Sequence, residues 1–168
     1  MTDPALAPYR QTLAESVVFA QLSPAELDLV MASCHLVDVP AGATLLAEGR
    51  RGEGLYVILE GRVEFFLPDR AVGGVRRPSR VRLNVLGPGR CFGEDGVIDD
   101  QASSASAEAV TATRLCVLAT EAFRSIANEH DRIGRIVYSN LLRFLVSRLR
   151  AKDKELDMVL FVEESPSG

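Results

Sequence analysis

The pattern of residues 35 to 119 most constrains the fold of this chain, because apolar residues recur there at every second position and glycines interrupt them at short intervals. A period of two is typical of β-strands, and many short strands with turn signals indicate a sandwich or a barrel. The strand candidates read HLVDV, TLLAEG, LYVILEGRVEFFL, RVRLNVL, SASAEAV and ATRLCVL, and the third makes two strands. Turns that require positive φ are expected at Gly42, Gly49, Gly61 and Gly89.

The RVRLNVL segment alternates cleanly between apolar and polar residues. It predicts a strand with one apolar face made by Val81, Leu83 and Val85, and one polar face made by Arg80, Arg82 and Asn84.

Helical patterns flank the β region on both sides. The first 20 residues are compatible with a helix after Pro8, with Leu13, Val17 and Val18 roughly on one face. In LSPAELDLVMASC, Ser23 and Glu26 can form a capping box, and apolar residues then follow at helical spacing: Leu27, Val30, Met31 and Cys34. TEAFRSIANEH predicts a short helix. A longer one, from Asp131 to about Val162, would be about 45–50 Å long at 1.5 Å per residue.

Composition indicates one globular domain without a membrane segment. The chain has 168 residues, 47% of them hydrophobic and 25% charged, with a net charge of −4 that favours neither nucleic acid nor an anionic membrane. Three cysteines, Cys34, Cys91 and Cys116, have no paired spacing and suit a reducing compartment, each as a small buried hydrophobe. Neither a signal peptide nor an apolar run of about 20 residues is visible, so we expect a cytoplasmic protein.

The sequence gives little support for an enzymatic function. GxSxG, HExxH, CxxC and GxxxxGK[ST] do not occur, and the two histidines, His35 and His130, are expected to be structural or solvated. A haem or metal site using Cys91 with a histidine stays open as a minor alternative. We therefore expect no catalytic residue, no metal and no cofactor.

The order of the motifs resembles the cyclic nucleotide-binding domain family, which includes the sensory domains of catabolite-activator-type regulators. The matching segments are LSPAEL, VPAGATLLAEG, GLYVILEGRVEFF, LNVLGPGRCFGE, ATRLCVLATEAF and LLRFLVSRLR, across about residues 19 to 150. The resemblance implies an α+β fold: an eight-stranded antiparallel β-roll of double-stranded jelly-roll type, flanked by helices. The expected divisions are an N-terminal extension (1–18), the roll with its flanking helices (19–130), a long dimerisation helix (131–162) and a disordered tail (163–168).

The resemblance also identifies the segment that would hold a cyclic nucleotide, the phosphate-binding cassette. In the family its backbone amides receive the phosphate, its glutamate bonds the ribose, and an arginine about nine residues later pairs with the phosphate. This chain keeps the start of the cassette, Phe92, Gly93, Glu94 and Gly96, and its small-residue end, Ser104, Ala105 and Ser106. It departs at two positions, with Ser103 in place of the arginine and Asp95 in place of a large apolar residue.

Charge decides what these departures predict. From Cys91 to Thr113 there is no Lys or Arg, whereas Glu94, Asp95, Asp99, Asp100 and Glu108 are acidic. An arginine–phosphate pair is worth about 3–5 kcal/mol when partly buried. Asp95 could also cap the short cassette helix and occupy its amides. We therefore predict a degenerate cassette with weak or lost affinity for cyclic AMP and cyclic GMP, in a module that acts through protein contacts.

A second hypothesis is a true sensor that binds cyclic AMP, cyclic GMP or a cyclic dinucleotide by an atypical anion contact. The segment DRAVGGVRRPSRVR could supply a cation, or could form a docking patch for an unknown protein partner, or could be a solvated mobile loop. Its arginines are Arg70, Arg76, Arg77, Arg80 and Arg82.

The long helix predicts a homodimer. Ile133, Val137, Leu141 and Phe144 line one face, which can pack on the roll. A second apolar seam with steps of four and three is interrupted at Lys152: Tyr138, Leu142, Leu145, Leu149, Leu156 and Val159. This 3.5-residue period is the pattern of two supercoiled helices, and a parallel pair is expected. No helix-turn-helix pattern follows the helix, so we expect no direct DNA binding.

Overall fold

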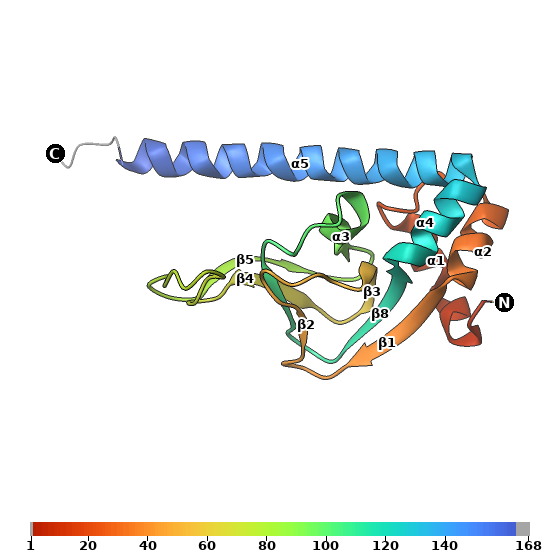
Figure 1. Ribbon diagram of the computed structural model, residues 1–168, viewed down its shortest axis with the longest axis horizontal. Helices are drawn as coiled ribbons and strands as arrows, with labels where there is room; N and C mark the ends of the chain where they lie inside the picture. Colours follow the sequence, from red (N-terminus) through yellow and green to blue (C-terminus); the bar gives the residue numbers. More distant parts are fainter. Residues whose placement is uncertain (1, 164–168) are drawn as a thin grey trace.

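The structure, a computed structural model that describes residues 2–163, contains eight strands in two four-stranded antiparallel sheets (Figure 1). One sheet has the order β1-β8-β3-β6 and the other the order β2-β7-β4-β5. The strands are β1 Cys34–Val39, β2 Thr44–Leu46, β3 Gly54–Glu60, β4 Val63–Leu67, β5 Val81–Leu86, β6 Cys91–Phe92, β7 Ser106–Ala109 and β8 Thr113–Ala119. The predicted eight-stranded roll with flanking helices is confirmed.

The central strands β3 and β8 separate two hydrophobic cores. One side of β3 turns Tyr56 and Ile58 into the interior of the roll, with Leu115 and Val117 of β8. Its other side turns Leu55, Val57 and Leu59 toward the helices. Burial on both faces explains why GLYVILE is almost continuously apolar, since strands covered on both sides lose the usual polar alternation.

Glycines make the predicted turns of the roll. Gly42, Gly49, Gly61 and Gly89 all have positive φ. At Gly61, which joins β3 to β4, a Cβ atom would lie 2.5 Å from the carbonyl oxygen of Ala112, so both the conformation and the space require glycine.

The β5 strand departs from the alternation expected from its sequence. A bulge places Asn84 opposite Phe65 and Arg82 opposite Phe66, so Leu83 is an extra residue in the ladder. Val81, Leu83 and Val85 are all exposed. The prediction of one apolar face was therefore wrong, because β5 is an edge strand whose register slips by one residue at the bulge.

The helices pack against the β1-β8-β3-β6 sheet. They are the 3₁₀ helix η1 Pro4–Tyr9, α1 Arg10–Glu15, α2 Pro24–Ala32, α4 Thr120–Glu129 and α5 Asp131–Glu163, together with α3 Glu94–Ile98 in the cassette. The capping box at α2 is present as predicted, with Ser23 and Glu26 bonding each other's backbone amides. Val17 is exposed, contrary to expectation, because α1 ends at Glu15.

The helix α5 runs along the roll and continues well past the other helices (Figure 1). Ile133, Val137, Leu141 and Phe144 are buried against the core, as the sequence predicted. Farther along, apolar side chains remain exposed: Leu142, Val146, Leu149, Leu156, Met158, Val159, Leu160 and Phe161. Residues 164–168, most of the segment predicted as a disordered tail, lie outside the described residues.

The three cysteines are buried and free. Burial is the main cause that raises the pKa of the Cys91 thiol to about 12, and a hydrogen bond with Cys116, followed by burial, raises that of Cys34. Cys34 and Cys91 are therefore packing residues with little thiolate at neutral pH. Within residues 2–163, no helix is both long enough and apolar enough to cross a bilayer.

Candidate ligand-binding site

The cassette loop, residues 91–106, begins at the strand β6, and the aromatic ring of Phe92 fixes this strand to the roll. Phe92 in β6 pairs with Tyr56 in β3, and their rings stack 4.7 Å apart. Phe65 of β4 meets Phe92 edge-on at 5.4 Å. This ring cluster fills the interior of the roll and holds the start of the loop in place.

Gly93 lets the chain turn sharply into α3. Its φ of 87° is left-handed, and a Cβ atom would lie 2.3 Å from the carbonyl oxygen of Gly54. Gly93 is the N-cap of α3, and no side chain caps this helix. The suggestion that Asp95 caps its amides was therefore wrong; the backbone carbonyl of Asp95 instead accepts hydrogen bonds from the amides of Asp99 and Gln101. Gly96 lies within α3. A Cβ atom added there would have room, since the nearest atom, the hydroxyl oxygen of Thr120, would be 3.9 Å away.

Glu94 is buried and is held by α5. Only 7% of its side chain is exposed, and Arg148 donates a hydrogen bond from Nη1 to its carboxylate. The Arg148 guanidinium also lies over the Phe144 ring, 5.5 Å from its centroid. The carboxylate that the resemblance assigns to a ribose thus already has a charged partner, one that the sequence gave no reason to expect.

Ser103 is bonded to backbone groups on both sides. Its hydroxyl donates to the carbonyl oxygen of Ala105 at 2.7 Å. Its amide donates to the carbonyl oxygen of Arg50 at 2.9 Å, and its carbonyl oxygen accepts from the amide of Gly49 at 2.8 Å. With Gly49 left-handed, Gly49 and Arg50 oppose Ser103 as a bulge. The backbone of Arg50 therefore lies directly beside the position that lacks the arginine.

The end of the cassette serves two purposes. The Ser106 hydroxyl is buried and accepts a hydrogen bond from the amide of Glu48 at 3.0 Å, which ties β7 to the β2–β3 loop. Ser104 and Ala105 face a cleft instead.

Arginines from other elements offset part of the acidic charge of the cassette and of β7. Asp100 pairs with Arg51 at 2.9 Å and lies 3.9 Å from Arg124. Glu108 lies 3.5 Å from Arg80. Of the five carboxylates noted in the sequence, only Asp95 and Asp99 have no ion pair within the described part of the chain. A bound phosphate would therefore meet less repulsion than the sequence alone suggests.

The arginine loop, residues 68–82, spans the β4–β5 connection and the first two residues of β5, and it points its paired cations to the outer side of the roll. Arg77 makes two hydrogen bonds with Glu48, at 2.8 and 3.1 Å. Glu64, largely buried, accepts hydrogen bonds from both Arg80 and Arg82. The Arg80 guanidinium also stacks on Phe66, 3.4 Å from the ring centroid. These three arginines hold the loop against the roll, which leaves Arg70 and Arg76 as its exposed and unpaired cations among the described residues.

A cleft of about 330 Å³ lies between the mouth of the roll and α5. We call it the α5 cleft. Its apolar lining includes Phe65, Leu83 and Phe144. Its cationic lining is Arg90, Arg148 and Lys152, and Lys152 is paired with Glu155 at 2.7 Å. This space adjoins Ser104 and Ala105 of the cassette.

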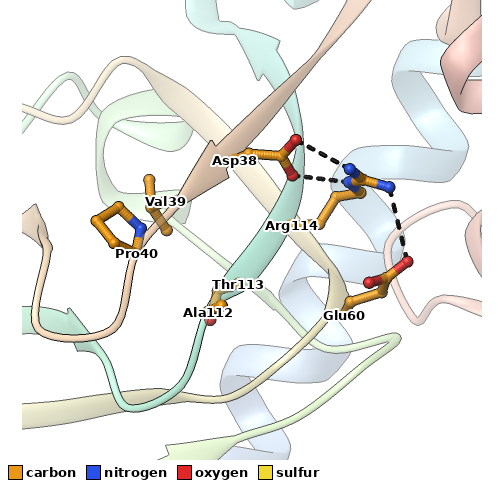
Figure 2. A pocket seen from close by; sticks show the side chains of 7 residues that line it. All are labelled: Asp38, Val39, Pro40, Glu60, Ala112, Thr113 and Arg114. Atoms are coloured by element: carbon orange, nitrogen blue, oxygen red, sulfur yellow. Dashed lines mark hydrogen bonds and ion pairs between the residues drawn. The ribbon is translucent and has the colours of Figure 1, made fainter.

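A second cavity, of about 460 Å³, lies at the ends of β1 and β8 (Figure 2). The Arg114 guanidinium there reaches Asp38 at 2.7 and 2.9 Å, and Glu60 at 3.8 Å. The hydroxyl of Tyr9 accepts from Arg114 at 2.9 Å, and these bonds with Asp38 and Tyr9 raise the pKa of Arg114. Because its charges satisfy one another, and because Arg114 also binds Tyr9, this cluster anchors the N-terminal segment to the ends of β1 and β8.

Comparison with known proteins agrees with this architecture. A model of the cyclic nucleotide-binding domain matches residues 36–130, more than half of the chain. The chain belongs to the cyclic nucleotide-binding domain family. It is 34% identical over 148 residues to the cyclic AMP receptor protein of Thermus thermophilus, covering 88% of this chain and 64% of the relative.

Two further proteins match over nearly the same share of this chain. A CRP-like cAMP-activated global transcriptional regulator of Mycobacterium tuberculosis is 29% identical, covering 91% of this chain and 64% of its own length. The crystal structure of a cyclic nucleotide-binding domain from Methylobacillus flagellatus superposes with a TM-score of 0.78 at 26% identity, covering 91% of this chain and 85% of that one. The chain thus spans just under two thirds of the length of the curated regulators that it matches.

Two residues at the site were not predicted from the sequence. Arg148 was overlooked because it lies 54 residues from Glu94, and only the docking of α5 on the roll brings them together. Arg50 was overlooked because its relation to Ser103 depends on the bulge between the β2–β3 loop and the cassette. Neither contact has a local sequence signal.

Proposed function

We propose that this chain is a non-catalytic regulatory module of the cyclic nucleotide-binding domain family whose cassette has weak or lost affinity for cyclic AMP and cyclic GMP, and which acts through protein contacts. The observation that carries this proposal is Ser103, which bonds Ala105 and offers no cation where the family has its arginine. Glu94, already paired with Arg148, adds to it. Three arginines of the arginine loop cannot replace it, since they are held on the outer side of the roll.

The size of the missing interaction sets the expected affinity. Two charge-assisted hydrogen bonds at about 1.5–2.5 kcal/mol each amount to about 3–5 kcal/mol. That corresponds to a roughly 100- to several-thousand-fold loss of affinity, which would turn a micromolar site into a millimolar one.

Calorimetric titration tests this proposal. We expect no saturable heat from cyclic AMP or cyclic GMP below about 100 µM. Saturable binding in the low micromolar range would overturn it.

One observation favours the alternative, a sensor with an atypical anion contact. Gly49 and Arg50 oppose Ser103 across two backbone hydrogen bonds, and the Arg50 side chain is exposed, with no ion pair among the described residues. An arginine next to the empty position is one substitute that this chain offers. If titration shows micromolar binding, Arg50→Ala should weaken it at least tenfold, whereas Arg70→Ala in the arginine loop should not change it.

The exposed seam of α5 supports a second copy of this chain as the partner. Leu142, Leu149 and Leu156 are each more than half exposed, and they repeat at seven-residue intervals. Tyr138 instead packs edge-on against Phe123 within the subunit, so the seam begins one step later than the sequence suggested. A coiled-coil pair buries such a stripe. We expect a dimer by sedimentation at micromolar concentration and a monomer for Leu145→Glu with Leu149→Glu; a wild-type monomer at about 50 µM would contradict the seam.

A further inference from the structure

The geometry points to Arg148 as a link between two subunits: it holds Glu94 of its own cassette and, in the paired state, also binds Asp153 on the α5 helix of a second copy. This inference rests on the proposed α5 dimer and deepens it. It makes the contact between the two copies depend on the cassette carboxylate.

The phase of the seam places both residues at its flanks. With Leu142, Leu149 and Leu156 at the first core position of successive heptads, Arg148 precedes a core residue and Asp153 follows Lys152, the next core position. In a parallel pair, the residue directly before a core leucine faces the residue of the partner helix whose number is five higher. Arg148 then faces the partner's Asp153, and by symmetry the contact forms twice.

Opposite charge occurs at these flanking positions only once in the described part of the seam. The corresponding positions one heptad earlier are Leu141 and Val146, both apolar, and one heptad later they are Glu155 and Leu160. The Arg148–Asp153 contact is therefore the one that can fix the register by charge. The other cations on this stretch, Arg143, Arg150 and Lys154, fall at positions that point away from a partner helix.

Arg148 has donors left for a second carboxylate. Its Nη1 is bonded to Glu94, and its side chain remains 53% exposed. A guanidinium carries five N–H donors in a fixed plane, so it can bind two carboxylates from different directions. Exchange of one carboxylate for the other is disfavoured, because release would leave the buried Glu94 charge unpaired. Arg148 therefore bridges the two acids, and Glu94 orients the guanidinium for the partner.

Asp153 is available for this contact. It is exposed, and it has no ion pair within residues 2–163, whereas its neighbour Lys152 is already paired with Glu155. Asp157, one turn farther along, is equally exposed and unpaired but lies outside the seam, so it provides a matched control.

The experiment measures the dimer dissociation constant by sedimentation for wild type, Asp153→Arg and Asp157→Arg, at low and at high salt. Asp153→Arg replaces two attractions by two repulsions, and we expect it to raise the dissociation constant about tenfold or more, less so at high salt. Asp157→Arg, with the same change in charge, should stay within about twofold. Asp153→Glu, which keeps the charge, should retain most of the wild-type affinity.

The link to the cassette is measured by a double-mutant cycle with Glu94→Gln and Asp153→Asn. We expect Glu94→Gln to raise the dissociation constant about threefold in the wild type and to have no further effect once Asp153 is neutral. Independent effects of the two changes would overturn the bridge. Equal effects of Asp153→Arg and Asp157→Arg would overturn the contact itself while the seam stands, whereas a monomeric wild type would remove the seam and this inference together. The Asp153 comparison remains decisive if Glu94→Gln fails to fold.

Discussion

Two loops of the roll carry most of the charge that bears on ligand binding, and they use it in opposite ways. The cassette loop has carboxylates and no Lys or Arg. The arginine loop has five arginines, of which Arg77, Arg80 and Arg82 pair with Glu48 and Glu64. A count of charges would suggest that one loop complements the other. The structure instead directs the arginines to carboxylates on the outer side of the roll.

The difference teaches that an arginine's ability to reach the cassette depends more on the direction of its side chain than on its closeness to the cassette in the chain. On β4, Phe65 faces the interior and the next residue, Phe66, carries the guanidinium of Arg80. Residues that alternate along a strand point to opposite faces, so cations bound beside Phe66 are on the wrong side of the sheet to reach the cassette. Position 103 keeps its deficit of charge unless an arginine of another loop supplies it.

Substitution of two glycines in the cassette loop tests which of them the backbone conformation of the loop requires. Gly93→Ala forces a left-handed alanine and brings a Cβ against the carbonyl of Gly54, so we expect a loss of about 2–4 kcal/mol in unfolding free energy. Gly96→Ala, in a helix with free space around it, should be neutral or stabilising by up to about 1 kcal/mol. Urea denaturation measures both, and equal effects would show that the cassette is not held as described.

The arginine loop would be tested by removing its paired and unpaired arginines separately. Arg80→Ala with Arg82→Ala leaves Glu64 buried without a partner, and we expect the melting temperature to fall by about 5 °C. Arg70→Ala with Arg76→Ala removes the same charge from exposed positions and should change it by less than about 2 °C. Similar shifts for the two pairs would mean that the loop is solvated, with no role in stability.

The smallest expected effect on stability comes from the ion pair of Glu48 with Arg77, and low pH should abolish it. The hydrogen bonds from Arg77 lower the pKa of Glu48, so its charged form stabilises the folded state above the ordinary glutamate pKa of about 4.3. This stability is lost as the pH falls through the lowered value. We expect Glu48→Gln to be less stable than wild type at pH 7 and equal to it in strong acid. A difference that persists unchanged at low pH would contradict the ion pair.

The sequence predicted those parts of the fold that depend on local chemistry. The capping box at Ser23 and Glu26, the turns at Gly61 and Gly89 and the extent of the long helix are set by neighbouring residues, and the structure has all of them. The bulge at Leu83 was not predictable, because a register shift depends on the partner strand. The partners of Glu94 and Glu48 were not predictable either, since they come from residues 54 and 29 positions away.

The central claim is that the cassette retains its geometry and lacks a cation at position 103. Calorimetric titration of Ser103→Arg with Asp95→Leu against cyclic AMP tests it, with Ser104→Arg plus Asp95→Leu as the control that adds the same charge one residue farther on. We expect the first variant to bind at least about 100-fold more tightly than wild type, and the second to bind no better than wild type. An equal gain in both variants, or none in either, would contradict the claim.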